Sequence, residues 1–119
     1  SINIKGCSGK TYSFDGPYSN TNPLEDRSGV YVILCNNGTG NTVIDVGESA
    51  TVKTRIDSHD RKNCWNNNCS GTLKCCVYYT PNLQQHGRME VEQDIAVSTD
   101  QFAERDSKVR CVWVKAKLV

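Results

Sequence analysis

Residues 29–47 read GVYVILCNNGTGNTVIDVG, and this stretch decides the fold. Residues 30–35 are almost continuously apolar, which is typical of a strand that is buried on both faces. Residues 36–41 carry a strong turn signal of asparagine and glycine, and residues 42–46 return to β-type side chains. The stretch therefore predicts two strands that pair as an antiparallel hairpin.

A helix is expected to follow this hairpin, with Ser49 or Thr51 as its cap and its end at about Asp60. The apolar template of a core-facing helix has the spacing i, i+3, i+4 and i+7. That template is filled here by Val52, Arg55, Ile56 and His59. The arginine and the histidine are therefore predicted to face the protein beside the two best apolar residues of the helix.

A second unit of strand and helix is predicted further along the chain. Residues 61–71 are polar and rich in asparagine and predict a loop, residues 72–80 predict a third strand, and residues 83–98 predict a helix. Glu92 lies in the middle of the apolar arc of this helix, whereas Glu90 lies on its polar side. A carboxylate that points inward is costly unless it is paired or holds a cation.

The two ends of the chain add elements to this core. Residues 2–4 and 11–14 predict an N-terminal hairpin, and residues 17–28 predict a loop. Residues 100–107 predict a loop or a short helical turn, and residues 109–119 predict a half-exposed C-terminal strand. The 119 residues are expected to form one domain. The predicted fold class is α+β, with a small central antiparallel β-sheet flanked by helices in the order β-β-α-β-α.

Composition and charge narrow the possible environments. The chain is 37% hydrophobic and 23% charged, as in an ordinary soluble globular protein. No apolar run is long enough to cross a bilayer and no signal peptide is visible, so we expect no membrane partner and a cytoplasmic location. Because the net charge is only +1, any positive potential that attracts nucleic acid must be local.

Seven cysteines are a high and odd number for this length. A framework made only of disulfides would leave one of them unpaired, so we expect free, mostly structural thiols in a reducing compartment. The alternative is a structural zinc site. Its candidate ligands are Cys64, Cys69, Cys75, Cys76 and His59. Tight ligand pairs of the CxxC type, which zinc sites usually use, are missing.

Several motif residues follow the predicted elements in order. They are Gly29-Val30-Tyr31 on the first strand, Asp45-Val46-Gly47 on the second strand, and then Arg55, His59 and Glu92 on helices. This ordered set resembles the GIY-YIG nuclease family over about half of the chain. The resemblance implies a GIY-YIG-like core at about residues 28–98 and metal-dependent cleavage of DNA phosphodiester bonds.

The resemblance also gives each residue a role. The first-motif tyrosine, the second-motif glycine, the helix arginine, the frequent downstream histidine and the metal-binding glutamate correspond to Tyr31, Gly47, Arg55, His59 and Glu92. Glu92 would hold Mg²⁺ or Mn²⁺, of which magnesium keeps much of its hydration. Arg55 would place its planar guanidinium against phosphate oxygens. Tyr31, with its phenolate favoured by a nearby cation, would orient or deprotonate water, and His59 would be its hydrogen-bond partner.

Asp45 departs from the family pattern, because it stands where the second motif carries a tyrosine. If its side chain faces the site, it can pair with Arg55, share the metal with Glu92 or serve as the base in place of the tyrosine. If the side chain faces away, Asp45 is a surface carboxylate. We expect it to face inward, and we expect Asp45→Asn to abolish metal-dependent cleavage.

DNA is the expected partner. Its candidate contacts are Gly47, Lys53, Arg61, Lys62 and Lys74. Such contacts position the phosphate backbone and carry no base code, and the four cations are equally well explained as ordinary solvated side chains. Since no recognition helix is visible, either a targeting or oligomeric partner protein supplies specificity, or specificity is low.

Three functions remain open from the sequence. The first is a small metal-dependent DNA endonuclease. The second is a catalytically degenerate GIY-YIG-like module, marked by Asp45, that binds nucleic acid or protein without cutting. The third is a zinc-stabilised interaction domain. Purely structural roles are also open for the motif residues, with Tyr31 and His59 as core residues and Arg55 and Glu92 as a buried ion pair between helices.

Overall fold

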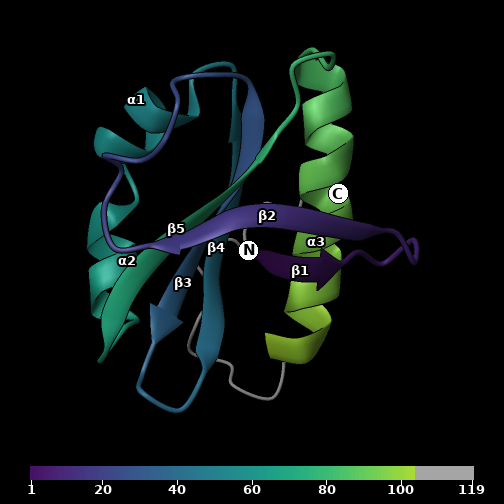
Figure 1. Cartoon of the computed structure of the whole chain (residues 1–119). Helices are drawn as coiled ribbons and strands as arrows, with labels where there is room; N and C mark the ends of the chain where they lie inside the picture. Colours follow the sequence, from purple (N-terminus) through teal and green to yellow (C-terminus); the bar gives the residue numbers. More distant parts are fainter. Residues whose placement is uncertain (104–119) are drawn as a thin grey trace.

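A computed structural model describes residues 1–103 of the chain, with side chains through residue 96. Its elements are β1 (Ile2–Lys5), β2 (Thr11–Tyr18), β3 (Gly29–Asn36), β4 (Asn41–Ser49), α1 (Val52–Asp57), α2 (Lys62–Asn67), β5 (Thr72–Tyr79) and α3 (Gln85–Ala103). The strands form one antiparallel sheet in the order β1-β2-β5-β3-β4 (Figure 1). The predicted α+β class, with an antiparallel sheet flanked by helices, is confirmed. No helix within residues 1–103 is both long and apolar enough to cross a membrane.

The hairpin of β3 and β4 sets which side chains share a face of the sheet. Tyr31 lies opposite Gly47 and Ile33 lies opposite Asp45, with a bulge at the next step of the register. Directly opposed residues of an antiparallel pair point to the same face. Asp45 and Gly47 therefore lie on the same face of the sheet as Tyr31, as the family match implied.

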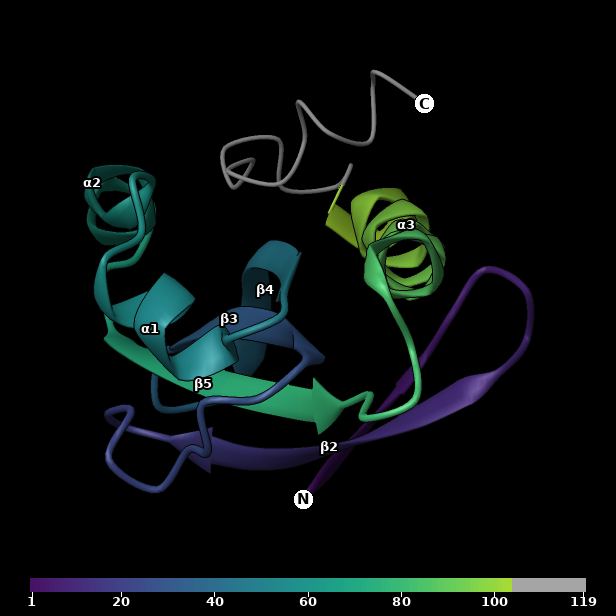
Figure 2. The same ribbon diagram turned by 90° about the horizontal axis from the view of Figure 1, so that it is seen from above.

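The sheet separates two helical layers. Seen from above, α1 and α2 lie on one side of β3 and β4, and α3 lies on the other (Figure 2). The core cluster on the first side includes Tyr31 and Ile33 packed with Ile56 and Trp65. The cluster on the second side includes Val30, Val32 and Val46 packed with Ile95 and Ala96. Each strand of the central hairpin thus contributes alternate residues to two different cores.

Three predicted boundaries were wrong. The predicted loop at 61–71 contains α2, because Trp65 of this asparagine-rich segment is buried against the sheet and tertiary packing overrides weak helix propensity. The helix expected to end at Asp60 ends at Asp57. The loop expected from Pro17 begins later, since β2 continues to Tyr18. Pro17 lies where the pairing of β2 with β5 is interrupted, so its missing N–H group is tolerated there.

The C-terminal predictions fall largely beyond the part of the chain that the structure describes. The strand at 109–119 and most of the segment at 100–107 lie outside residues 1–103. Residues 100–103, which were expected to begin a loop or a short helical turn, belong to the end of α3. The helix predicted over 83–98 is therefore confirmed as an element but is longer than expected.

The start of α1 is capped by a residue that the sequence did not indicate. Thr51 occupies the cap position, but its side chain makes no capping hydrogen bond. Instead, Asp26 accepts the Thr54 backbone N–H at 2.9 Å and the Thr54 hydroxyl at 2.6 Å. These hydrogen bonds lower the pKa of Asp26, and a carboxylate at a helix N-terminus is favourable.

The expectation of free thiols was wrong for Cys35, Cys64 and Cys69, which are disulfide-bonded. Cys35, near the end of β3, forms a disulfide with Cys69, in the connection between α2 and β5. Cys64 and Cys69 are therefore lost from the proposed zinc ligands, and the reducing, cytoplasmic compartment loses its main support, because disulfides persist in oxidising compartments. Adjacent Cys75 and Cys76 are free, and they lie in the clusters on opposite faces of the sheet, as strand alternation predicts.

Removal of this disulfide is expected to destabilise the domain. The bond joins residues 34 apart, and closing a loop of that length stabilises the folded state by about 4 kcal/mol through the entropy of the unfolded chain. The variant Cys35→Ser/Cys69→Ser should lose about this much in urea unfolding, whereas Cys7→Ser, which removes an exposed free thiol, should not. Equal stability of the double variant and the wild type would contradict the bond.

Candidate active site

Tyr31 and Gly47 form the base of the candidate site on the α1/α2 side of the sheet. Tyr31 is 1% exposed and its ring lies over Gly47. A Cβ atom at residue 47 would overlap the ring and the hydroxyl of Tyr31. Glycine is therefore required at this position by the tyrosine of the opposite strand, which explains physically why the two motif residues occur together.

His59 fixes the hydroxyl of this tyrosine. The Tyr31 Oη and His59 Nε2 atoms are 2.6 Å apart, while the backbone N–H of Arg61 donates to His59 Nδ1 at 3.0 Å. A neutral imidazole has one donor and one acceptor nitrogen. Because Nδ1 accepts, the proton lies on Nε2, which donates to the tyrosine oxygen. The Tyr31 O–H proton is thus left for another acceptor.

Both members of this pair are neutral at neutral pH. Burial raises the pKa of Tyr31, and the Asp45 carboxylate adds to this, while Arg61 and Arg55 oppose it. Burial, with further contributions from Arg61 and Arg55, lowers the pKa of His59 to about 4. The phenolate expected from the sequence is therefore not favoured. Tyr31 is equipped to donate a hydrogen bond rather than to take a proton from water.

Asp45 is buried with every strong acceptor position in use. Its carboxylate accepts from Arg61 Nε at 2.6 Å, from Arg61 Nη2 at 3.2 Å and from Trp65 Nε1 at 2.8 Å. The backbone N–H of Val46 donates to it at 2.8 Å. Asp45 faces inward as expected, but its partner is Arg61, not Arg55. With four donors on its carboxylate, Asp45 has no lone-pair position left for a water molecule or a metal ion.

Arg61 was predicted as a DNA contact, and the structure gives it a different position. Its guanidinium is bidentate on Asp45, and its backbone holds His59. No pattern in the sequence indicates this role, because Arg61 and Asp45 are 16 residues apart and lie on different elements. Trp65, which joins Asp45 to the His59 ring at a centroid distance of 4.6 Å, was likewise missed.

Arg55 connects this buried cluster to solvent. Its charge and a side-chain hydrogen bond act on Tyr31, and its side chain is 38% exposed. Its hydrogen-bond partner is Asp60 at 3.0 Å, which is itself 74% exposed. An exposed ion pair of this kind is weak, so Arg55 can exchange Asp60 for another anion. Tyr31, Arg55 and His59 therefore converge as predicted.

Glu92 is not brought to this cluster. It lies on α3, and the buried neighbours Ile95 and Ala96 on that helix belong to the core on the other face of the sheet. Glu92 is itself buried, as its place on the apolar arc predicted. Tyr31, Arg55 and Glu92 were expected to converge in one pocket. Of these three residues, only Tyr31 and Arg55 lie together.

The donor set around Tyr31 does not fit a divalent cation. Asp45 is saturated by four donors, and Glu92 belongs to the other layer. Within the part of the chain that the structure describes, no three His, Cys, Asp or Glu side chains are grouped to hold a metal ion. The residues around Tyr31 therefore do not support a chemical step that uses a bound metal.

The other proposed DNA contacts are ordinary surface cations. Lys53 donates to the Thr21 carbonyl at 3.2 Å, Lys62 to the Asp57 carbonyl at 2.5 Å, and Lys74 to the Ser19 hydroxyl at 2.9 Å. Lys53 also pairs with the Asp57 carboxylate at 4.0 Å. Their arrangement is compatible with a phosphate backbone.

The chain was not found to resemble any known protein when compared with family models, curated proteins and solved structures. Tyr31, Gly47, Arg55 and His59 are adjacent in space as well as ordered in sequence.

The depressed pKa of His59 predicts a loss of stability in acid. The folded state keeps His59 neutral to about pH 4, whereas the unfolded chain binds a proton near pH 6.5. The stabilisation is therefore complete above about pH 6.5 and is lost as the pH falls toward 4, by about 3 kcal/mol. Urea unfolding of His59→Gln should show a correspondingly weaker acid dependence.

His86 provides the matched control for this measurement. It is the other histidine of the chain, and its side chain is 91% exposed on α3. His86→Gln should keep the acid dependence of the wild type. If the two variants have the same pH profile, His59 is not the group that titrates.

Proposed function

We propose that this protein binds DNA phosphates and hydrolyses phosphodiester bonds with a GIY-YIG-type site centred on Tyr31. The observation that supports this most strongly is the 2.6 Å hydrogen bond between Tyr31 and His59 beside the solvent-accessible guanidinium of Arg55. These groups come from separate elements and have perturbed pKa values. A buried polar cluster of this kind costs stability and is typical of functional sites.

Each residue has a role that follows from its protonation and its position. Arg55 leaves Asp60 and binds two phosphate oxygens with its planar guanidinium. Tyr31, whose oxygen is held by His59 Nε2–H, donates its own proton as a hydrogen bond to a phosphoryl oxygen, where negative charge develops. Asp45, Arg61 and Trp65 hold His59 and the connection between α1 and α2 that carries it, so they position the donors without contacting the phosphate.

A second candidate is DNA binding without hydrolysis. It is favoured by Asp45, which replaces the second-motif tyrosine and is occupied by Arg61 and Trp65. In that case Arg55 and the lysines beside it would bind the phosphate backbone, and the Tyr31–His59 pair would serve as part of the core.

A plasmid-nicking assay with Mg²⁺ separates the two candidates and tests the metal dependence, which rests on the resemblance alone. Hydrolysis predicts nicking by the wild type and its loss on addition of a chelator. Glu92→Gln should abolish nicking if Glu92 holds the metal, whereas Glu90→Gln, on the exposed side of the same helix, should not. DNA binding without nicking by the wild type would select the second candidate, and equal nicking by all three proteins would show that Glu92 does not hold the metal.

A further inference from the structure

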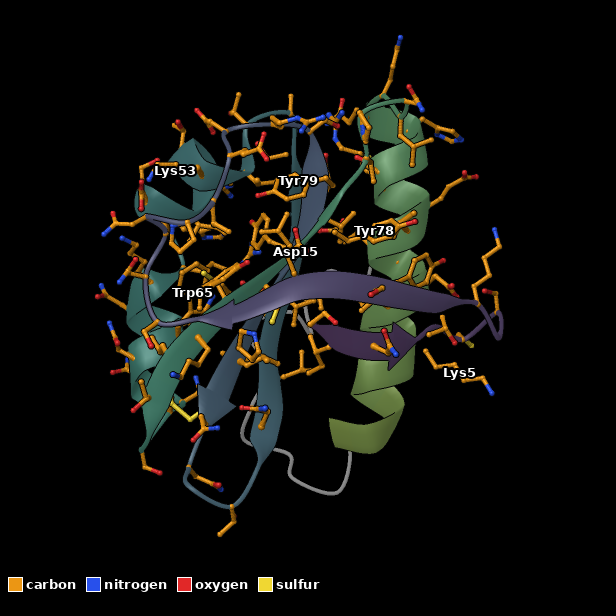
Figure 3. The ribbon with its side chains drawn as sticks, viewed as in Figure 1. Lys5, Asp15, Lys53, Trp65, Tyr78 and Tyr79 are labelled. Carbon is orange, nitrogen blue, oxygen red and sulfur yellow. A yellow bond between two sulfur atoms is a disulfide. The ribbon has the colours of Figure 1, made fainter. Side chains whose placement is uncertain are left out.

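A cavity of about 280 Å³ lies on the α1/α2 side of the sheet, next to the candidate active site. Its inner surface is apolar and aromatic. The side chains that form it include Tyr18, Ile33, Ile56, Trp65 and Leu73. They come from β2, β3, α1, α2 and β5, so the cavity is built by the packing of the whole layer. Figure 3 shows Trp65 on the α2 side of the sheet.

Hydrogen-bond donors surround this apolar surface. Lys62 and Asn66 contribute from α2, and Lys74 and Ser19 contribute from β5 and the end of β2. Lys74 donates to the Ser19 hydroxyl and Lys62 to a backbone carbonyl, both uncharged acceptors. No acidic side chain is among the described residues that line the cavity. Two ammonium groups thus stand beside an apolar cavity and are available to an anion.

The Asp57 carboxylate, which is close to the cavity, is directed to other partners. Asp57, whose charge reaches Cys75 in the cavity wall, accepts from the Thr21 hydroxyl at 2.5 Å and pairs with Lys53 at 4.0 Å. The aromatic and apolar lining of the cavity can therefore contact a flat apolar group, and its lysines can bind a negative charge. Stacking on aromatic side chains together with cationic contacts is how proteins bind single nucleotides of a strand.

We propose that this cavity binds one nucleotide unit, with its base against Trp65 and Tyr18 and its phosphate at Lys62 and Lys74. Trp65 joins the cavity to the active-site cluster, since its indole N–H donates to Asp45 and its ring contacts His59. The choice of a nucleotide rests on the proposed function. The cavity would hold a base displaced from the strand whose phosphate lies at Arg55, or a free nucleotide of the same chemistry.

Binding is measured on the full chain without divalent metal, so that its outcome does not depend on hydrolysis. The probes are a labelled single-stranded oligothymidylate of about eight nucleotides and an abasic strand of the same length. The wild type should bind the base-bearing strand about tenfold more tightly than the abasic strand. Leu73→Trp, which fills the cavity, should abolish that difference. Equal affinity of the wild type for the two strands would overturn the proposal.

The role of the two lysines is tested against a matched pair. Lys62→Ala/Lys74→Ala should weaken binding of the base-bearing strand about tenfold and reduce its salt dependence. Lys5→Ala/Lys10→Ala removes the same charge from the N-terminal hairpin, where Lys5 lies on the other side of the molecule from Trp65 (Figure 3). Equal losses in the two double variants would show a non-specific charge effect and overturn the assignment of the phosphate.

Thymidine monophosphate distinguishes the two sources of the nucleotide. Competition by the free nucleotide, lost in Leu73→Trp, would assign the cavity to free nucleotides. Binding of the strand without such competition would assign it to a displaced base. Failure of nicking in the assay above, with base-dependent binding retained, would remove hydrolysis and leave the nucleotide site intact.

Discussion

Asp45→Ala is expected to lower the free energy of unfolding by about 4 kcal/mol. The substitution leaves the Arg61 guanidinium and the Trp65 indole N–H without their acceptor in a region where Asp45 itself is fully buried. Breaking one partner out of a buried ion pair typically costs about 3–5 kcal/mol, because the remaining charge stays desolvated. Trp65 also packs against His59, so the position of α2 is expected to loosen.

Asp45→Asn separates charge from shape at the same position. The amide keeps the size of the side chain, but its NH₂ group would face the donors of Arg61 and Trp65. We therefore expect most of the destabilisation to remain. Both variants are measured by urea unfolding followed by circular dichroism. The control is Asp60→Ala, which removes an exposed ion pair with Arg55 and should change stability by less than about 1 kcal/mol.

This result decides how an activity loss in Asp45 variants is interpreted. The sequence suggested that Asp45→Asn would abolish cleavage because Asp45 acts as a base or a metal ligand. With four donors on its carboxylate, the same loss would follow from displacement of His59 and α2. Only an Asp45 variant with wild-type stability and no cleavage would restore a direct chemical role, and a stability loss below about 1 kcal/mol would contradict the ion-pair argument.

Local patterns predicted the elements and the facing of individual residues. The apolar run before the asparagine-glycine turn predicted the hairpin of β3 and β4. Helical spacing predicted that His59 faces the protein, and the residue is 5% exposed although it lies after the end of α1. The same spacing predicted that Glu92 points inward. Periodicity states that a residue faces the protein, but it does not state which side of a sheet the helix covers. For this reason Glu92 was expected beside Tyr31 and lies in the other layer.

The remaining features depend on contacts between distant parts of the chain. The partner of Asp45 is Arg61 because α2 turns back over β4, and the segment that forms α2 looked like a loop. The disulfide joins Cys35 and Cys69 because the end of β3 meets the connection that follows α2. Counting cysteines or charges cannot indicate such pairs, since no period or motif links their positions.

Tyr31→Phe is expected to reduce plasmid nicking by about 100- to 1,000-fold. The change removes one hydroxyl whose proton is free for a phosphoryl oxygen, because the Tyr31 oxygen accepts from His59 Nε2–H. Loss of one such donor to a transition state has an effect of this size. His59 Nε2–H loses its acceptor, so stability should fall by only about 1–3 kcal/mol, and the variant remains folded.

Tyr12→Phe is the matched control. The Tyr12 hydroxyl donates a hydrogen bond to Asp94 at 2.8 Å, but it lies in the cluster on the α3 side of the sheet. This variant should lose a similar amount of stability and keep full nicking activity. DNA binding should be unchanged in both variants, because Arg55 supplies the exposed charge. If Tyr31→Phe nicks DNA at the wild-type rate, Tyr31 takes no part in hydrolysis, and its bond to His59 is a feature of the core.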